Sequence, residues 1–133
     1  MRPVFIALIS ILLSAVASRG ILEDYQDLGH GFSLETHYEH TNNAFESFGH
    51  FEYLYYEDTR LGQCSAFEVE FSPTERYAFF PHSSSYRVYD SWTGRLFRLA
   101  TSEGVLKRVK WDENANMVTV IYKSNPSQSF KLK

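Results

Sequence analysis

The sequence predicts an all-β protein, an antiparallel meander of about eight to nine short strands that follows an N-terminal signal peptide. Stretches rich in aromatic and β-branched residues recur along the chain and are separated by clusters of turn-forming residues. Apolar residues at helical spacing are scarce after the first thirty positions. Parallel strands would need crossover segments of a dozen or more residues, for which these short connections leave no room.

The first element is a predicted secretory signal peptide over residues 1–17. Arg2 is followed by an apolar run at residues 4–13 and by small residues that end at Ala17. This order is typical of a signal peptide cleaved after Ala17, and the apolar run is too short to cross a bilayer of about 30 Å. A retained membrane anchor is the alternative. We therefore expect a secreted or periplasmic protein, free of the membrane after cleavage, with one all-β domain over residues 18–133.

Beyond the signal peptide, we expect one or two helical turns in residues 20–29 and then strands only. The predicted strands cover residues 32–38, 50–58, 65–71, 76–82, 86–90, 95–100, 105–111, 117–123 and 128–133. In residues 65–71, Phe67, Val69 and Phe71 would share one face and Glu68 and Glu70 the other. Between two later strands, the Asp90 carboxylate is expected to accept turn N–H groups, with Gly94 at positive φ.

Charge and cysteine content limit the classes of partner and the sources of stability. Residues 20–59 contain no Lys or Arg and carry a formal charge of −9, whereas residues 60–133 contain 11 basic and 7 acidic residues. Either the strand faces simply differ in solvated charge, or the acidic half meets a basic partner or the basic half of another copy. The single cysteine, Cys64, excludes an internal disulfide and is expected to be buried, with an intermolecular disulfide as the alternative.

A repeat links two parts of the C-terminal half. Residues 71–80, FSPTERYAFF, align without gaps on residues 111–120, WDENANMVTV, at an offset of 40 residues. In both copies an aromatic residue ends one strand, a polar turn follows, and a second apolar strand begins. An offset of about 40 to 45 residues is the period of a four-stranded propeller blade.

The segment VEFSPTERYAFF…YRVYDSWTGRL resembles a WD40-type β-propeller repeat. Tyr89 and Asp90 stand where that family usually has Trp-Asp, and its Gly-His dipeptide is missing. The resemblance covers one blade, a partial second blade over residues 105–133, and residues 50–66 loosely. It implies no particular function, because propellers carry out many.

A closed propeller needs at least four blades, or about 160 residues. Three arrangements therefore remain for residues 18–133: copies that complete a ring of blades together, a small barrel or sandwich with blade-like hairpins, or a degenerate remnant. We favour the barrel or sandwich, because isolated blades would leave long unpaired strand edges. The oligomeric state stays open.

The sequence predicts neither catalysis nor a cofactor. Histidines cluster beside carboxylates in the acidic half, but in the strand that holds Glu35, His37 and Glu39 the next candidate, His40, points to the opposite face, so no metal site is expected. Glu68 and Glu70 would be about 7 Å apart on a strand, the basis of a less favoured hydrolase alternative. Nucleophile and phosphate-binding motifs are missing, and the basic half is too mildly charged for nucleic acid.

The favoured function is protein binding through the acidic, aromatic-rich half, as in an inhibitor or immunity-type protein that contacts a basic partner. Residues 37–58 combine tyrosine and phenylalanine anchors with carboxylates. The expected binding residues are Tyr38, Phe45, Phe48, Tyr53, Tyr55, Tyr56, Glu57 and Asp58. A β-barrel carrier for a small ligand is the alternative, because a barrel of eight strands holds one small molecule.

Overall fold

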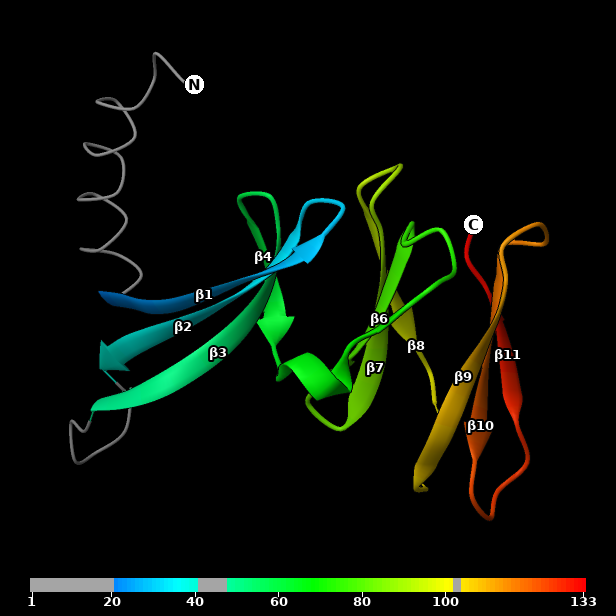
Figure 1. The fold of residues 1–133 in the computed structure, drawn as a ribbon. Helices are drawn as coiled ribbons and strands as arrows, with labels where there is room; N and C mark the ends of the chain where they lie inside the picture. Colours follow the sequence, from blue (N-terminus) through cyan, green and yellow to red (C-terminus); the bar gives the residue numbers. More distant parts are fainter. Residues whose placement is uncertain (1–20, 41–47, 102–103) are drawn as a thin grey trace. The chain divides into compact units, whose positions relative to one another are not determined.

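The computed structural model describes residues 21–40, 48–101 and 104–133, and these form antiparallel β-sheets, which confirms the predicted fold class. The chain divides into two compact units, with the boundary between Gln63 and Cys64. Figure 1 shows the strands along the chain. The predicted signal peptide lies outside the described residues, and the described part of the chain contains no helix long and apolar enough to cross a membrane.

The N-terminal unit is one four-stranded sheet in the order β1-β2-β3-β4. Its strands are β1 Ile21–Gly29, β2 Phe32–His40, β3 Phe48–Tyr56 and β4 Thr59–Gln63. The predicted helical turns at residues 20–29 are wrong, since β1 pairs with β2 from Ile21 opposite Tyr38 to Gly29 opposite Phe32. A weak local helical pattern yields to this long ladder, because tertiary pairing overrides intrinsic propensity.

Two tight hairpin turns close the same end of this sheet. His30 and Gly31 join β1 to β2 with φ values of 52° and 89°, the left-handed combination of a type I′ turn. Gly31 is required there, because a Cβ atom would lie 2.8 Å from Cε1 of Tyr56. Glu57 and Asp58 join β3 to β4, and the Glu57 N–H donates to the Gly31 carbonyl over 2.8 Å, which holds the two turns together.

The C-terminal unit contains two sheets, in the orders β5-β6-β7-β8 and β11-β10-β9. Its strands are β5 Glu70–Phe71, β6 Tyr77–His82, β7 Ser85–Asp90, β8 Arg95–Leu99, β9 Leu106–Asp112, β10 Met117–Tyr122 and β11 Gln128–Lys131. The core between the two sheets is apolar and aromatic. It consists of Tyr77, Phe79, Val88, Leu99, Val118, Val120, Tyr122 and Leu132. Tyr77 and Trp111 stack across it, with ring centroids 5.7 Å apart.

The strand predicted over residues 65–71 is only partly correct. A 3-10 helix occupies Ala66–Glu68, where the Ser65 N–H donates to the Glu68 carboxylate over 2.7 Å, and only Glu70–Phe71 form a strand. Phe67 is 88% exposed and so does not lie on a buried strand face. Glu68 and Glu70 therefore do not alternate along one strand as predicted, although both line a small pocket of about 130 Å³. Cys64 is buried, as expected.

The offset of 40 residues recurs in the structure of the two sheets. Ser72 and Tyr77 bracket one four-residue turn, and Asp112 and Met117 bracket the other. Beside the first turn, the N–H of Ser91, just after β7, donates to the carbonyl of Arg76, just before β6, over 2.9 Å. Beside the second turn, the N–H of Leu132, just after β11, donates to the carbonyl of Asn116, just before β10, over 2.7 Å. The turns differ in detail, because the left-handed residue is Glu75 in the first and Asn116 in the second.

A buried ion pair fixes the β7–β8 turn of the first sheet. Asp90, only 1% exposed, accepts two hydrogen bonds from the Arg76 guanidinium, over 2.9 and 2.8 Å. It also accepts the Trp92 N–H and the Thr93 hydroxyl, which confirms the predicted turn, and Gly94 has φ +76°. Burial alone would raise the pKa of Asp90, but the hydrogen bonds from Arg76, Thr93 and Trp92 outweigh it and lower that pKa.

The Arg76 guanidinium also lies between two aromatic rings, 4.7 Å from the centroid of Tyr77 and 4.5 Å from that of Trp92. A second contact runs to the other sheet, where Asn116 Oδ1 accepts the Tyr77 hydroxyl over 3.0 Å. Arg76 and Tyr77 therefore link the β7–β8 turn of the first sheet to the turn before β10 in the second sheet.

Candidate functional site

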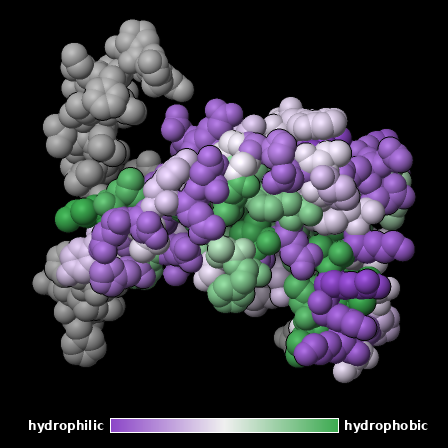
Figure 2. Space-filling view, in the orientation of Figure 1, coloured by the Kyte–Doolittle hydropathy of each residue, from purple (hydrophilic) through white to green (hydrophobic). Residues whose placement is uncertain are grey.

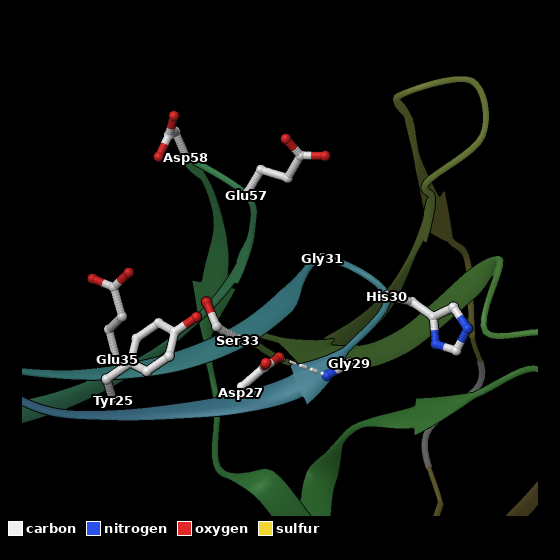
Figure 3. Close-up of a pocket in the computed structure, with 9 residues that line it drawn as sticks. All are labelled: Tyr25, Asp27, Gly29, His30, Gly31, Ser33, Glu35, Glu57 and Asp58. Atoms are coloured by element: carbon white, nitrogen blue, oxygen red, sulfur yellow. Dashed lines mark hydrogen bonds between the residues drawn. The ribbon is translucent and has the colours of Figure 1, made fainter. Parts of the chain in front are cut away.

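The candidate site is an acidic pocket at the turn end of the N-terminal sheet. Cross-strand pairing places Tyr25 opposite Glu35 and Asp27 opposite Ser33, so these four side chains share one face. The β3–β4 turn adds Glu57 and Asp58 at the same end (Figure 3). The pocket has a volume of about 520 Å³. It is lined by Tyr25, Asp27, Gly29, His30, Gly31, Ser33, Glu35, Glu57 and Asp58.

Four of the lining residues are carboxylates, and the lining contains no Lys or Arg. The Glu57 and Asp58 side chains are exposed, and Figure 3 shows them on the β3–β4 side of the pocket with Asp27 on the β1 side. Tyr25 is 57% exposed, and Figure 3 shows its ring near Glu35. Four negative charges around one hollow attract a cation, because field lines concentrate in a cleft lined by one sign of charge.

Local hydrogen bonds hold the walls of the pocket in place. Asp27 Oδ1 accepts the Gly29 N–H over 2.8 Å, which fixes that carboxylate against the β1–β2 turn. Glu35 Oε1 lies 2.9 Å from Nε2 of His37, whose ring is buried with only 3% of the residue exposed. Glu57 and Asp58 owe their position to the backbone of the second turn. The Asp27 and Glu35 carboxylates are therefore held in position before any ligand arrives.

A network of tyrosines and charged groups continues along the same face of the sheet. The Tyr53 hydroxyl donates to Glu39 over 2.5 Å, and Arg60 Nε donates to the Tyr55 hydroxyl over 2.9 Å. The Arg60 guanidinium lies 3.7 Å from the Tyr53 ring centroid and 3.5 Å from Glu39. Burial, followed by the hydrogen bond to Glu39, raises the pKa of Tyr53 to about 12. This face therefore already holds one guanidinium between aromatic rings and a carboxylate.

The structure separates the binding residues that the sequence predicts. Glu57 and Asp58 line the pocket, whereas Tyr53 and Tyr55 belong to the network on the same face, where Tyr55 is only 1% exposed. The remaining predicted residues lie elsewhere or are not described. Tyr38 contacts His50 and Tyr56 contacts Phe32 on the opposite face, Phe45 lies outside the described residues, and Phe48 belongs to β3 with no side chain described.

Of the nine lining residues, the sequence predicted only Glu57 and Asp58, in part because it predicted a helix where β1 lies. Tyr25 and Asp27 take their places only when β1 pairs with β2, which also brings Ser33 and Glu35 beside them. A usable signal was present in the sequence. Gly29-His30-Gly31 separates two stretches with alternating residues, and glycine in a two-residue connection is a strong hairpin indicator.

Comparison with protein-family models, with curated proteins and with solved structures finds no match for this chain. Among the residues that the structure describes, His, Cys, Asp and Glu side chains do not gather in groups of three or more that could hold a metal ion. The chemistry of the site must therefore be inferred from its own residues.

Proposed function

We propose that this chain is a secreted or periplasmic protein-binding module whose N-terminal unit receives a basic side chain of a partner protein in the acidic pocket. The observation that carries this proposal is the pocket lining, with four carboxylates and no Lys or Arg. Carboxylates form their strongest hydrogen bonds with guanidinium and ammonium groups. A pocket of this composition favours a cationic group over an apolar small ligand, which supports protein binding over the carrier alternative.

The contacts of Arg60 support an arginine as the preferred group. On the same face, its guanidinium stacks on Tyr53 and approaches Glu39, so this surface combines an aromatic ring with a carboxylate around a planar cation. Tyr25 and the pocket carboxylates offer the same combination, with no Lys or Arg among the lining residues. A partner arginine in the acidic pocket would therefore contact an aromatic ring and a carboxylate, as Arg60 does on the same face of the sheet.

The proposed class is an inhibitor or immunity-type protein for a basic secreted enzyme or toxin, with no catalytic role of its own. Rim carboxylates suit such a role because they accelerate the encounter with a basic surface. For the C-terminal unit we propose two successive propeller-type blades. The repeated four-residue turns and the paired hydrogen bonds of Ser91 and Leu132 support this assignment.

Affinity capture from the native extract tests the proposed function. The bait is the mature chain, and the matched baits are Glu57→Gln/Asp58→Asn, which removes two pocket charges, and Glu23→Gln/Asp24→Asn, which removes two charges of β1 outside the pocket lining. We expect a basic partner to be retained at low salt by the unaltered chain and the β1 variant, and lost with the pocket variant. Equal retention by all three baits would contradict the assignment of the pocket.

A further inference from the structure

The C-terminal unit carries a second polar pocket, at the β6–β7 turn end of its first sheet. Its volume is about 320 Å³. The lining consists of His82, Ser83, Ser84, Ser85, Tyr86, Arg87 and Arg98. In contrast to the acidic pocket, this lining contains two guanidinium groups, an imidazole, three serine hydroxyls and a tyrosine, and no carboxylate.

Strand pairing brings the basic groups together on one face. Arg87 of β7 lies directly opposite Arg98 of β8, and His82 of β6 lies opposite Ser85, two residues before Arg87. Like charges at directly opposed positions of an antiparallel pair destabilise a sheet. A sheet tolerates such a pair most easily when a counter-ion lies between the two charges.

The described part of the chain supplies no such counter-ion. In these residues, neither Arg87 nor Arg98 has a carboxylate within ion-pair distance, whereas Arg60 and Arg76 each have one. The same two charges disfavour protonation of the neighbouring groups. Burial, followed by the charges of Arg87 and Arg98, lowers the pKa of His82, and burial together with Arg98 lowers the pKa of Arg87.

The turn contributes hydrogen-bond donors of a second kind. Ser83 and Ser84 form the two-residue connection, both are exposed, and Ser83 has a φ of 54°. The Ser85 hydroxyl is already used, because it donates to the Leu99 carbonyl over 2.6 Å and so anchors the turn to β8. The two free turn hydroxyls therefore lie beside the paired guanidinium groups on a fixed hairpin.

We propose that this pocket binds a tetrahedral oxyanion, a phosphate or sulfate group, between the Arg87 and Arg98 guanidinium groups, with the Ser83 and Ser84 hydroxyls as further donors. Arginine presents planar pairs of N–H donors that match such oxygens, and hydrogen bonds to an anion are about twice as strong as neutral ones. The site is independent of the acidic pocket, since it lies in the other unit and takes a ligand of opposite charge.

Titration of the isotope-labelled full chain with inorganic phosphate, and separately with sulfate, followed by amide and histidine NMR, tests the proposal. Sodium chloride keeps the ionic strength constant. We expect saturable shifts confined to residues 82–87 and 98, with a dissociation constant on the order of 1 mM, and a rise in the pKa of His82 as the anion offsets the two arginines. Phosphate affinity should rise with pH as its second proton leaves, whereas sulfate affinity should not.

Two variants make the test specific. Arg98→Gln should weaken binding about tenfold, the value of one lost charge-assisted hydrogen bond. Arg95→Gln removes the same charge from the same strand outside the pocket and should bind as the unaltered chain does, and the amide spectrum shows whether each variant is folded. Absence of saturable shifts, shifts that chloride reproduces, or equal weakening by both variants would overturn the proposal.

Discussion

Replacement of Arg76 by methionine tests how far the C-terminal unit depends on its buried ion pair. Arg76→Met keeps an apolar stem between the Tyr77 and Trp92 rings but leaves the Asp90 carboxylate without its guanidinium, although that carboxylate is almost fully buried. Removal of one partner of a buried pair costs about 3 to 5 kcal/mol. The Trp92 N–H and the Thr93 hydroxyl still solvate Asp90, so we expect a loss of about 3 kcal/mol at pH 7.

Urea unfolding followed by tryptophan fluorescence measures this loss selectively. Both tryptophans of the chain, Trp92 and Trp111, lie in the C-terminal unit, so their emission reports the unfolding of that unit. A lower midpoint with an unchanged slope would identify a loss of stability rather than a change in the surface exposed on unfolding.

The stability difference between the variant and the unaltered chain should depend on pH in a definite direction. In the unaltered chain the folded pKa of Asp90 is lowered, so the ion pair stabilises the unit above the unfolded value of about 3.9, and this stability is lost as pH falls through the folded pKa. In Arg76→Met, we expect burial to outweigh the remaining hydrogen bonds from Thr93 and Trp92 and so to raise the pKa of Asp90. The variant therefore regains stability relative to the unaltered chain as pH falls from 7 toward about 4.

Arg95→Met is the matched control for this experiment. Arg95 is exposed, with its guanidinium 4.9 Å from the Phe97 ring centroid, and its replacement should change stability by less than about 0.5 kcal/mol. The reasoning would be refuted if Arg76→Met stayed within the same range at pH 7, or if its deficit did not shrink at low pH.

Three further predictions concern the core, a turn and a titration. Phe79→Ala, at a fully buried ring, should cost about 3 to 5 kcal/mol in the same fluorescence assay, and a loss below 1 kcal/mol would contradict the assigned core. Gly31→Ala forces a side chain into a left-handed turn beside Tyr56 at a cost of about 1 to 2 kcal/mol, so amide exchange in β1 and β2 should accelerate; unchanged exchange would argue against this turn. Tyr53 should ionise near pH 12 by ultraviolet titration and at lower pH in Glu39→Gln; an unshifted transition would exclude the Glu39 hydrogen bond.

Alternation and turn chemistry predict most of the strands of this fold. Residues 76–82 and 86–90 match β6 and β7 closely, because their aromatic and β-branched residues are flanked by turns with Ser, Asp and Gly. The repeat at an offset of 40 residues is detectable in the sequence for the same reason, because turn residues fix the length of the β5–β6 and β9–β10 connections. Sheet order and the packing of one sheet on another depend on contacts far apart in sequence, which local patterns do not encode.

The errors have physical causes in particular residues. Ile21, Leu22 and Tyr25 lie at helical spacing, yet they pair as a strand because β2 offers a long ladder. Residues 65–71 alternate like a strand, yet the hydrogen bond between the Ser65 N–H and Glu68 starts a 3-10 turn that exposes Phe67. Local alternation is a weak predictor where a side chain can satisfy the backbone instead.

The sequence predicts the charge of the candidate site but not which residues line it. The excess of carboxylates in residues 20–59 indicates an acidic surface, and the structure places Glu57 and Asp58 in the lining of the acidic pocket. The aromatic anchors were assigned without knowledge of which strand face each would occupy, so Tyr55 is buried and Tyr38 lies on the other face. A strand register fixes such faces, and a shift of one residue reverses them.

The most direct test of the proposed function is an NMR titration of the isotope-labelled chain with a tri-arginine peptide, with tri-citrulline as the uncharged isostere. We expect tri-arginine to shift the amides of Tyr25, Asp27, Glu57 and Asp58, with binding that weakens as salt is added and in Glu57→Gln/Asp58→Asn. Tri-citrulline should cause no such shifts. Equal shifts with both peptides, or tri-arginine shifts that avoid these four residues, would contradict the proposed recognition of a basic side chain in the acidic pocket.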